Sequence, residues 1–154
     1  MLSRARLQVP IIGGIYKKLY LSRVADNMHT MLSAAIPIVR ALEITRDVVG
    51  SPVYARALTD IAEDVKGGRL VSDSLGKHRE FPGIMTAMVK VGEEAGELGN
   101  ILETLSRFYR REVTAAVDTL VGLIEPILIV GLGLGVGVLL AAVLIPIYSI
   151  SASI

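Results

Sequence analysis

The last 29 residues of the chain, from Pro126 to Ile154, carry no charged side chain. A helix needs about 20 apolar residues to cross the hydrocarbon core of a bilayer, which is about 30 Å thick. The run is long enough to span, and its place at the C-terminal end is not that of a cleaved N-terminal signal. All charged residues lie before it. The sequence therefore predicts a water-facing domain anchored by a C-terminal membrane helix.

Basic residues beside the apolar run predict its orientation. Arg107, Arg110 and Arg111 precede the run, and no Lys or Arg follows it. By the positive-inside rule, the domain before the run is cytoplasmic and the C-terminus lies outside.

Composition excludes several other classes of protein. The net charge is +1 and charges of both signs are spread along the chain, so the clustered basic surface that nucleic acid requires is not expected. The absence of cysteine excludes disulfides, thiolate metal sites and thiol nucleophiles.

Apolar residues recur at intervals of three and four, which predicts helices, and no strand-like alternation is present. The expected helices cover residues 17–35, 38–49, 52–66, 72–76 and 82–95, followed by one from about Leu98. Because no break precedes the apolar run, the last helix is expected to continue to about Tyr148, with kinks at Pro126 and Pro146. The predicted fold is all-α: an antiparallel bundle of about six helices, the last extended into the membrane.

This pattern divides the chain into four parts. Pro10 and the pair Gly13-Gly14 indicate a loop, so residues 1–16 are predicted to be a linker. Residues 17–122 form the cytoplasmic bundle, 123–150 the transmembrane helix, and 151–154 a short tail outside.

Motifs of known enzymes are missing. The glycines from Gly131 to Gly137 do not have the G-x-G-x-x-G spacing, and neither H-E-x-x-H nor G-x-S-x-G occurs. An anchored metal- or acid-dependent hydrolase would have to use Glu93, Glu94 and Glu97, without a nucleophile or a histidine cluster. We therefore predict a non-enzymatic protein with no cofactor and no bound metal.

Two features of the apolar run have alternative interpretations. Gly131 with Gly135 forms a G-x-x-x-G pair, which lets membrane helices pack closely, but glycine is also simply common in such helices. Pro126 would clash with the carbonyl of Gly122 and kink the helix. Its neighbour Glu125 lies either deep in the membrane with a partner or among the headgroups, solvated.

The segment from Gly92 to Asn100, GEEAGELGN, is the strongest feature before the run. Glu93, Glu94 and Glu97 could bind an arginine of a partner or, through oxygen ligands, a divalent ion. The alternative is an acidic first turn that interacts favourably with the helix dipole.

These residues also carry a resemblance. VGEEAGELGNIL at 91–102 resembles the signature VGE-x-(S/A)-G-x-L-x-x-(M/I)L of the bacterial type II secretion system F domain. Four further blocks resemble the same family in the same order: MLSAAIPIVRALEIT (31–45), VKGGRLVSDSL (65–75), FPGIMTAMVKVGE (81–93) and LIEPILIVGLGLGVGVLLAAVLIPIY (123–148). One departure is Ala35, where the family often has glycine; we expect an ordinary helix end there.

The resemblance implies a function. Family members are inner-membrane platform proteins of type II secretion and type IV pilus assembly machines, usually with two helical domains and three membrane helices; this chain resembles the second domain and the last helix. The implied partners are a hexameric assembly ATPase, pilin or pseudopilin membrane helices, other inner-membrane assembly proteins and further copies of the chain. The alternative is a membrane-anchored oligomerisation scaffold without a motor partner.

The family motifs fall on particular residues. The GE-x-x-G-x-L motif matches Gly92, Glu93, Gly96 and Leu98, and the EP motif matches Glu125 and Pro126. The implied location is the bacterial inner membrane, with the bundle in the cytoplasm.

Overall fold

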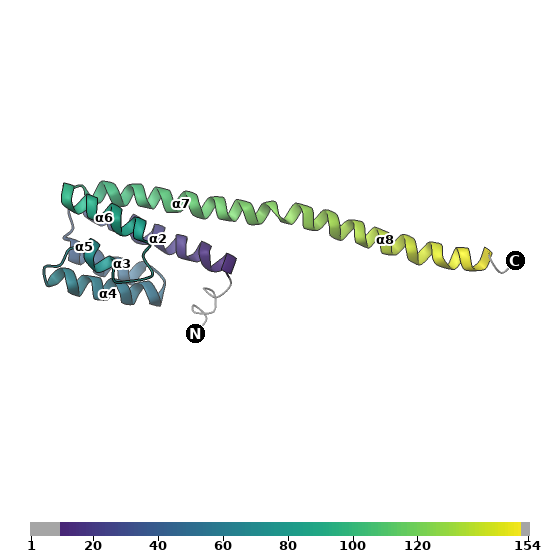
Figure 1. Ribbon diagram of the computed structural model, residues 1–154, viewed down its shortest axis with the longest axis horizontal. Coiled ribbons are helices and arrows are strands. Elements are labelled where there is room, and N and C mark those ends of the chain that lie inside the picture. Colours follow the sequence, from purple (N-terminus) through teal and green to yellow (C-terminus); the bar gives the residue numbers. More distant parts are fainter. Residues whose placement is uncertain (1–9, 152–154) are drawn as a thin grey trace. The chain divides into compact units, whose positions relative to one another are not determined.

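The computed structural model describes residues 10–151, and these are helical without any strand (Figure 1). The helices are α2 (Pro10–Ser33), α3 (Ile38–Val48), α4 (Pro52–Lys66), α5 (Val71–Leu75), α6 (Gly83–Ala95), α7 (Leu98–Gly122) and α8 (Ile124–Ser151). The chain forms two compact units, Met1–Thr114 and Ala115–Ile154. The predicted all-α class with a C-terminal apolar helix is confirmed.

The first unit encloses one hydrophobic core, to which every helix from α2 to α7 contributes. The predicted apolar faces supply most of it: Leu21, Val24, Ala25 and Met28 from α2, Leu58 and Ile61 from α4, Met85 and Val89 from α6, and Leu102 and Leu105 from α7 are all at most 3% exposed. Burying a side chain of this size contributes about 1.5–3 kcal/mol. The bundle is therefore held mainly by these faces.

Three helices of this unit end in the same hydrogen-bonding pattern. After α2 the N–H of Ile36 donates to the carbonyl of Met31 (3.0 Å), and after α6 the N–H of Glu97 donates to that of Gly92 (2.8 Å). After α4 the backbone N–H of Arg69 donates to the carbonyl of Asp64 (3.1 Å). This is the Schellman motif, which needs a residue in the left-handed conformation just after the helix.

Glycine occupies that position at two of the three ends, and alanine at the third. Gly68 and Gly96 have φ values of 89° and 71°, and Ala35 has a φ of 57°. The expectation of an ordinary helix end at Ala35 is therefore wrong. The turn demands a left-handed residue, a conformation that glycine adopts more easily than alanine.

Replacing Ala35 with glycine is expected to raise the free energy of unfolding by about 0.5–1 kcal/mol. The left-handed conformation costs an alanine about 1–2 kcal/mol, and glycine removes this cost. Glycine also loses more chain entropy on folding, which offsets part of the stabilisation. Gly96→Ala is the matched control and should lower stability by a similar amount. Urea unfolding of the detergent-solubilised chain, followed by circular dichroism, measures both. A destabilising Ala35→Gly would contradict the geometry.

The start of α2 differs from the sequence prediction. The helix begins at Pro10 rather than Lys17, which corrects the loop predicted for residues 10–16. Proline suits a first helical turn because its missing N–H is not needed there, and glycine lowers helix stability by only about 1 kcal/mol. Lys18, which pairs with Glu112 of α7 at 2.7 Å, helps to fix this end. The predicted linker residues 1–9 and tail residues 152–154 lie outside the described residues.

The second unit contains the end of α7 and all of α8. The predicted continuous helix is wrong at one residue: Leu123 is a turn, and its N–H donates to the carbonyl of Leu120 at 3.2 Å. Pro126 explains the break, because it has no N–H to donate to Gly122 and its ring would clash with that carbonyl. The break therefore lies three residues before the predicted kink.

One helical stretch of the described residues, within Leu98–Leu144, is long and apolar enough to cross a bilayer. Its apolar side chains in α8 are open to the surroundings; Leu132, for example, is 73% exposed. A surface of this kind is unfavourable in water and matches a lipid environment.

Candidate functional site

The acidic segment singled out from the sequence forms the turn between α6 and α7, which we call the acidic turn (residues 92–100). Its backbone course is set by the left-handed Gly96 and the Schellman bonds described above. The carbonyl of Glu97 then accepts the N–H of Ile101 at 3.1 Å, which begins α7. The predicted start of this helix at Leu98 is confirmed.

Gly92 allows the two helices of the turn to approach closely. A Cβ atom at this position would lie 2.9 Å from Cγ1 of Ile101 and 3.1 Å from Cα of Leu98. Contacts below 3.0 Å are not tolerated without movement, and one of the two neighbours is backbone. Gly92 of the family motif is therefore a packing residue.

The side chain of Glu93 binds the backbone of α5. Its Oε1 accepts the backbone N–H of Val71 at 2.6 Å, and its Oε2 accepts that of Ser72 at 2.9 Å. These N–H groups belong to the first turn of α5 and have no partner within that helix. A carboxylate there satisfies both donors and interacts favourably with the helix dipole. Glu93 thus has a structural role that its place in the sequence did not reveal.

Glu94 and Glu97 remain on the surface. Both are exposed, and Nδ2 of Asn100 donates to Oε2 of Glu97. Within the described residues, no hydrogen bond or ion pair engages the Glu94 side chain. These two carboxylates, and not Glu93, are available to a partner.

A surface depression of about 400 Å³ lies beside the turn, lined by Leu32 and Ser33 of α2 and by residues 96–100. His29 links α2 to the turn, because its Nδ1 atom lies 2.8 Å from the carbonyl oxygen of Gly99 and donates to it. Glu97 and Asn100 border this depression. The arrangement offers a partner both shape and negative charge at one place.

The three carboxylates do not converge on a common point. Glu93 is bound to α5, Glu97 is bound to Asn100, and Glu94 is exposed. Among the described residues, no group of three or more His, Cys, Asp or Glu side chains could hold a metal ion. Glu93, Glu94 and Glu97 therefore do not form a shared oxygen site in the described residues.

α5, to which Glu93 is bound, is also held from α4. Oδ2 of Asp64 accepts hydrogen bonds from the hydroxyl of Ser74 and from Nζ of Lys77, both at 2.6 Å. The bond from Lys77, followed by that from Ser74, keeps the pKa of the Asp64 carboxyl below its usual range. No local sequence pattern indicates these links, because their ends lie 10 to 22 residues apart.

The second predicted motif lies at the start of α8. Glu125 and Pro126 are in its first turn, where a carboxylate suits the positive end of the helix dipole. A Cβ atom at Gly131 or Gly135 would meet nothing within 4 Å. Within the described part of α8, no side chain of the chain covers these two glycines.

Comparison with known proteins places the bundle and the apolar helix together in one family. The family model described as type II secretion system (T2SS), protein F matches residues 24–146. The type IV pilus assembly protein PilC of Pseudomonas aeruginosa is 35% identical over 149 residues, and that of Thermus thermophilus is 32% identical over 151 residues. The type II secretion system protein F of Pseudomonas aeruginosa is 29% identical over 145 residues.

These relatives are longer proteins. The matches cover 97%, 97% and 94% of this chain but only 40%, 37% and 36% of the respective relatives. The relatives are named for pilus assembly and for secretion, and no enzymatic activity appears in those names.

Proposed function

Because the chain belongs to the family of type II secretion system protein F, we propose that it is part of the inner-membrane platform of a pilus or secretion assembly machine. The observation that carries the proposal is the family match over residues 24–146, which includes the acidic turn and most of α8. In this role the chain couples a cytoplasmic assembly ATPase to the insertion of pilin or pseudopilin subunits. It binds and positions other components and performs no chemical step itself.

The proposed contact for the ATPase is the open side of the acidic turn. Glu94 and Glu97 are exposed there, and the depression beside them is large enough to receive side chains of a partner. Carboxylates in such a position attract a basic partner surface and orient it. Glu93 contributes indirectly, because it keeps α5 attached to α6 beneath the turn.

The proposed contact for pilin or pseudopilin helices is α8. Gly131 and Gly135 lie four residues apart on one side of this helix, and small residues permit close approach of a second helix in lipid. The same face could join further copies of the chain. The three arginines before the apolar run support a cytoplasmic bundle and an outer C-terminus.

Charge reversal at the acidic turn is expected to weaken ATPase binding at least tenfold. The double variant Glu94→Lys/Glu97→Lys presents two positive charges where the proposal requires negative ones, and tenfold corresponds to about 1.4 kcal/mol. Pull-down of the detergent-extracted chain with the assembly ATPase of the same source measures binding, and the ATPase rate is read in parallel.

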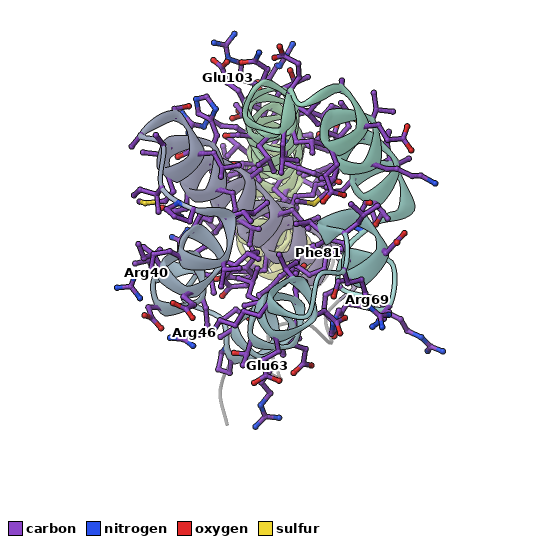
Figure 2. The ribbon with its side chains drawn as sticks, turned by 90° about the vertical axis from the view of Figure 1, so that its left-hand side faces the viewer. Arg40, Arg46, Glu63, Arg69, Phe81 and Glu103 are labelled. Atoms are coloured by element: carbon purple, nitrogen blue, oxygen red, sulfur yellow. The ribbon has the colours of Figure 1, made fainter. Side chains whose placement is uncertain are left out.

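The matched control is Asp60→Lys/Glu63→Lys on α4, where both side chains are also exposed. Figure 2 shows Glu63 on the outer side of α4, pointing away from the bundle. The control should bind as the unchanged chain does. Equal binding by both double variants would exclude the acidic turn as the contact. If the unchanged chain neither binds nor alters the rate, the motor-coupling role is wrong for this chain.

A further inference from the structure

α7 carries a row of arginines on its outer side in the first unit. Arg107, Arg110 and Arg111 are three and four residues apart, a spacing that places them on one side of a helix, whereas the buried residues Leu105 and Tyr109 lie on the other. The side chains of Arg107 and Arg110 are 70% and 67% exposed. We call these three arginines the basic face.

The carboxylates near the basic face leave most of its donors free. Arg107 forms an ion pair with Glu103, and a guanidinium nitrogen of Arg110 lies 3.3 Å from Oδ1 of Asp26. The Nε of Arg111 donates to the carbonyl of Arg107 at 3.4 Å, and within the described residues no carboxylate lies within 4.0 Å of it. A guanidinium has five N–H donors, and exposed ion pairs contribute at most about 1 kcal/mol. The face can therefore bind further anions without breaking the bundle.

Exposed apolar side chains follow the basic face within two turns of α7, with the exposed Asp118 among them. Val117, six residues after Arg111, is 42% exposed, and Val121 is 57% exposed. Such side chains continue through α8, which is the candidate membrane span. These arginines are the last basic residues before the span.

We propose that the basic face binds the phosphate headgroups of anionic phospholipids in the membrane that α8 enters. Guanidinium groups match phosphate oxygens in geometry as well as in charge. Phe108, in the same turn of α7, is 41% exposed, and an aromatic ring beside arginines suits the boundary between headgroups and acyl chains. Basic segments next to a membrane helix are attracted to anionic lipids by about 1 kcal/mol per residue.

The test uses the full chain reconstituted in phosphatidylcholine vesicles that contain spin-labelled phosphatidylglycerol. Electron paramagnetic resonance gives the fraction of labelled lipid held by the protein, relative to spin-labelled phosphatidylcholine. We expect a preference for phosphatidylglycerol of at least fivefold, which is about 1 kcal/mol expressed as a ratio. The preference should fall to less than half in Arg107→Gln/Arg110→Gln/Arg111→Gln. Replacement of the three arginines with lysine should keep most of it.

The matched control removes three other arginines, the exposed Arg40 and Arg69 and the half-buried Arg46, in Arg40→Gln/Arg46→Gln/Arg69→Gln. Each of these arginines has a nearby carboxylate: Arg40 lies 3.1 Å from Glu43, Arg46 lies 2.8 Å from Asp47, and Arg69 lies 3.8 Å from Asp64. Two of the three arginines of the basic face are paired in the same way. Figure 2 shows all three at the periphery of the bundle, away from Glu103 on α7. The charge change is the same, so the control should keep the preference.

Two results would overturn the proposal. One is an unchanged preference in the variant of the basic face; if ATPase binding is lost at the same time, the basic face is a protein contact. The other is an equal loss in the control, which would indicate net charge alone. Arg111→Gln alone, which breaks no ion pair among the described residues, keeps the test valid if the triple variant unfolds; it should lower the preference by itself.

Discussion

Replacing Glu93 with alanine is expected to lower the free energy of unfolding of the first unit by about 3 kcal/mol. The variant leaves the N–H groups of Val71 and Ser72 without their acceptor, and these residues are only 5% and 1% exposed. A hydrogen bond to a charged group contributes about 1.5–3 kcal/mol, and a buried donor left unpaired is costly. Urea unfolding followed by circular dichroism measures the loss.

Glu94→Ala is the control for this change. It removes the same chemical group from the next residue, whose side chain is exposed, so its effect should stay within about 0.5 kcal/mol. Hydrogen exchange adds a local measurement: the amides of Val71 and Ser72 should lose protection in the Glu93 variant and keep it in the Glu94 variant. Similar losses in both variants would mean that Glu93 does not cap α5.

This expectation changes how binding experiments at the turn must be designed. A Glu93 variant that fails to bind a partner could do so because α5 has detached from α6. Charge changes at Glu94 and Glu97 leave the hydrogen bonds of α5 intact. They therefore test the surface rather than the fold.

Gly92→Ala is expected to destabilise the first unit by about 2 kcal/mol. The added methyl group would overlap Ile101 and the backbone of Leu98, at 2.9 and 3.1 Å, and overpacking of this kind typically costs 1–3 kcal/mol. Gly99→Ala is the matched control, since a Cβ atom there meets nothing within 4 Å and alanine favours a helix. It should be neutral or stabilising. A neutral Gly92→Ala, measured by the same urea unfolding, would show that α6 and α7 can separate without loss.

The fold could be predicted largely because its helices are amphipathic and end at glycine or proline. The apolar faces of α2 and α4 and the start of α7 follow from local pattern alone. Exposure of single residues could not be predicted: Val48 and Ile84 fit apolar positions, yet they are 52% and 56% exposed. Their exposure depends on which neighbouring helix covers each face, and this is a tertiary property.

The acidic turn could be located from the sequence, but the roles of its residues could not. Glu93 bonds to residues 21 and 22 positions away, and no local pattern distinguishes it from Glu94. The left-handed turn at Ala35 was missed for a related reason, because alanine is a good helix former and gives no signal of positive φ. In the apolar run, Pro126 indicated a disturbance, and only the structure places the break at Leu123.

The break at Leu123 also has a mechanical consequence. The backbone hydrogen bonds of a helix make it resist bending. Pro126 cannot form one of these bonds, and the helix is interrupted by a turn close to it. The covalent backbone still carries tension across such a joint, whereas its resistance to bending is lower than that of the helix on either side. Displacement of the helix before Leu123 is therefore expected to tilt α8 less than it would in an unbroken helix.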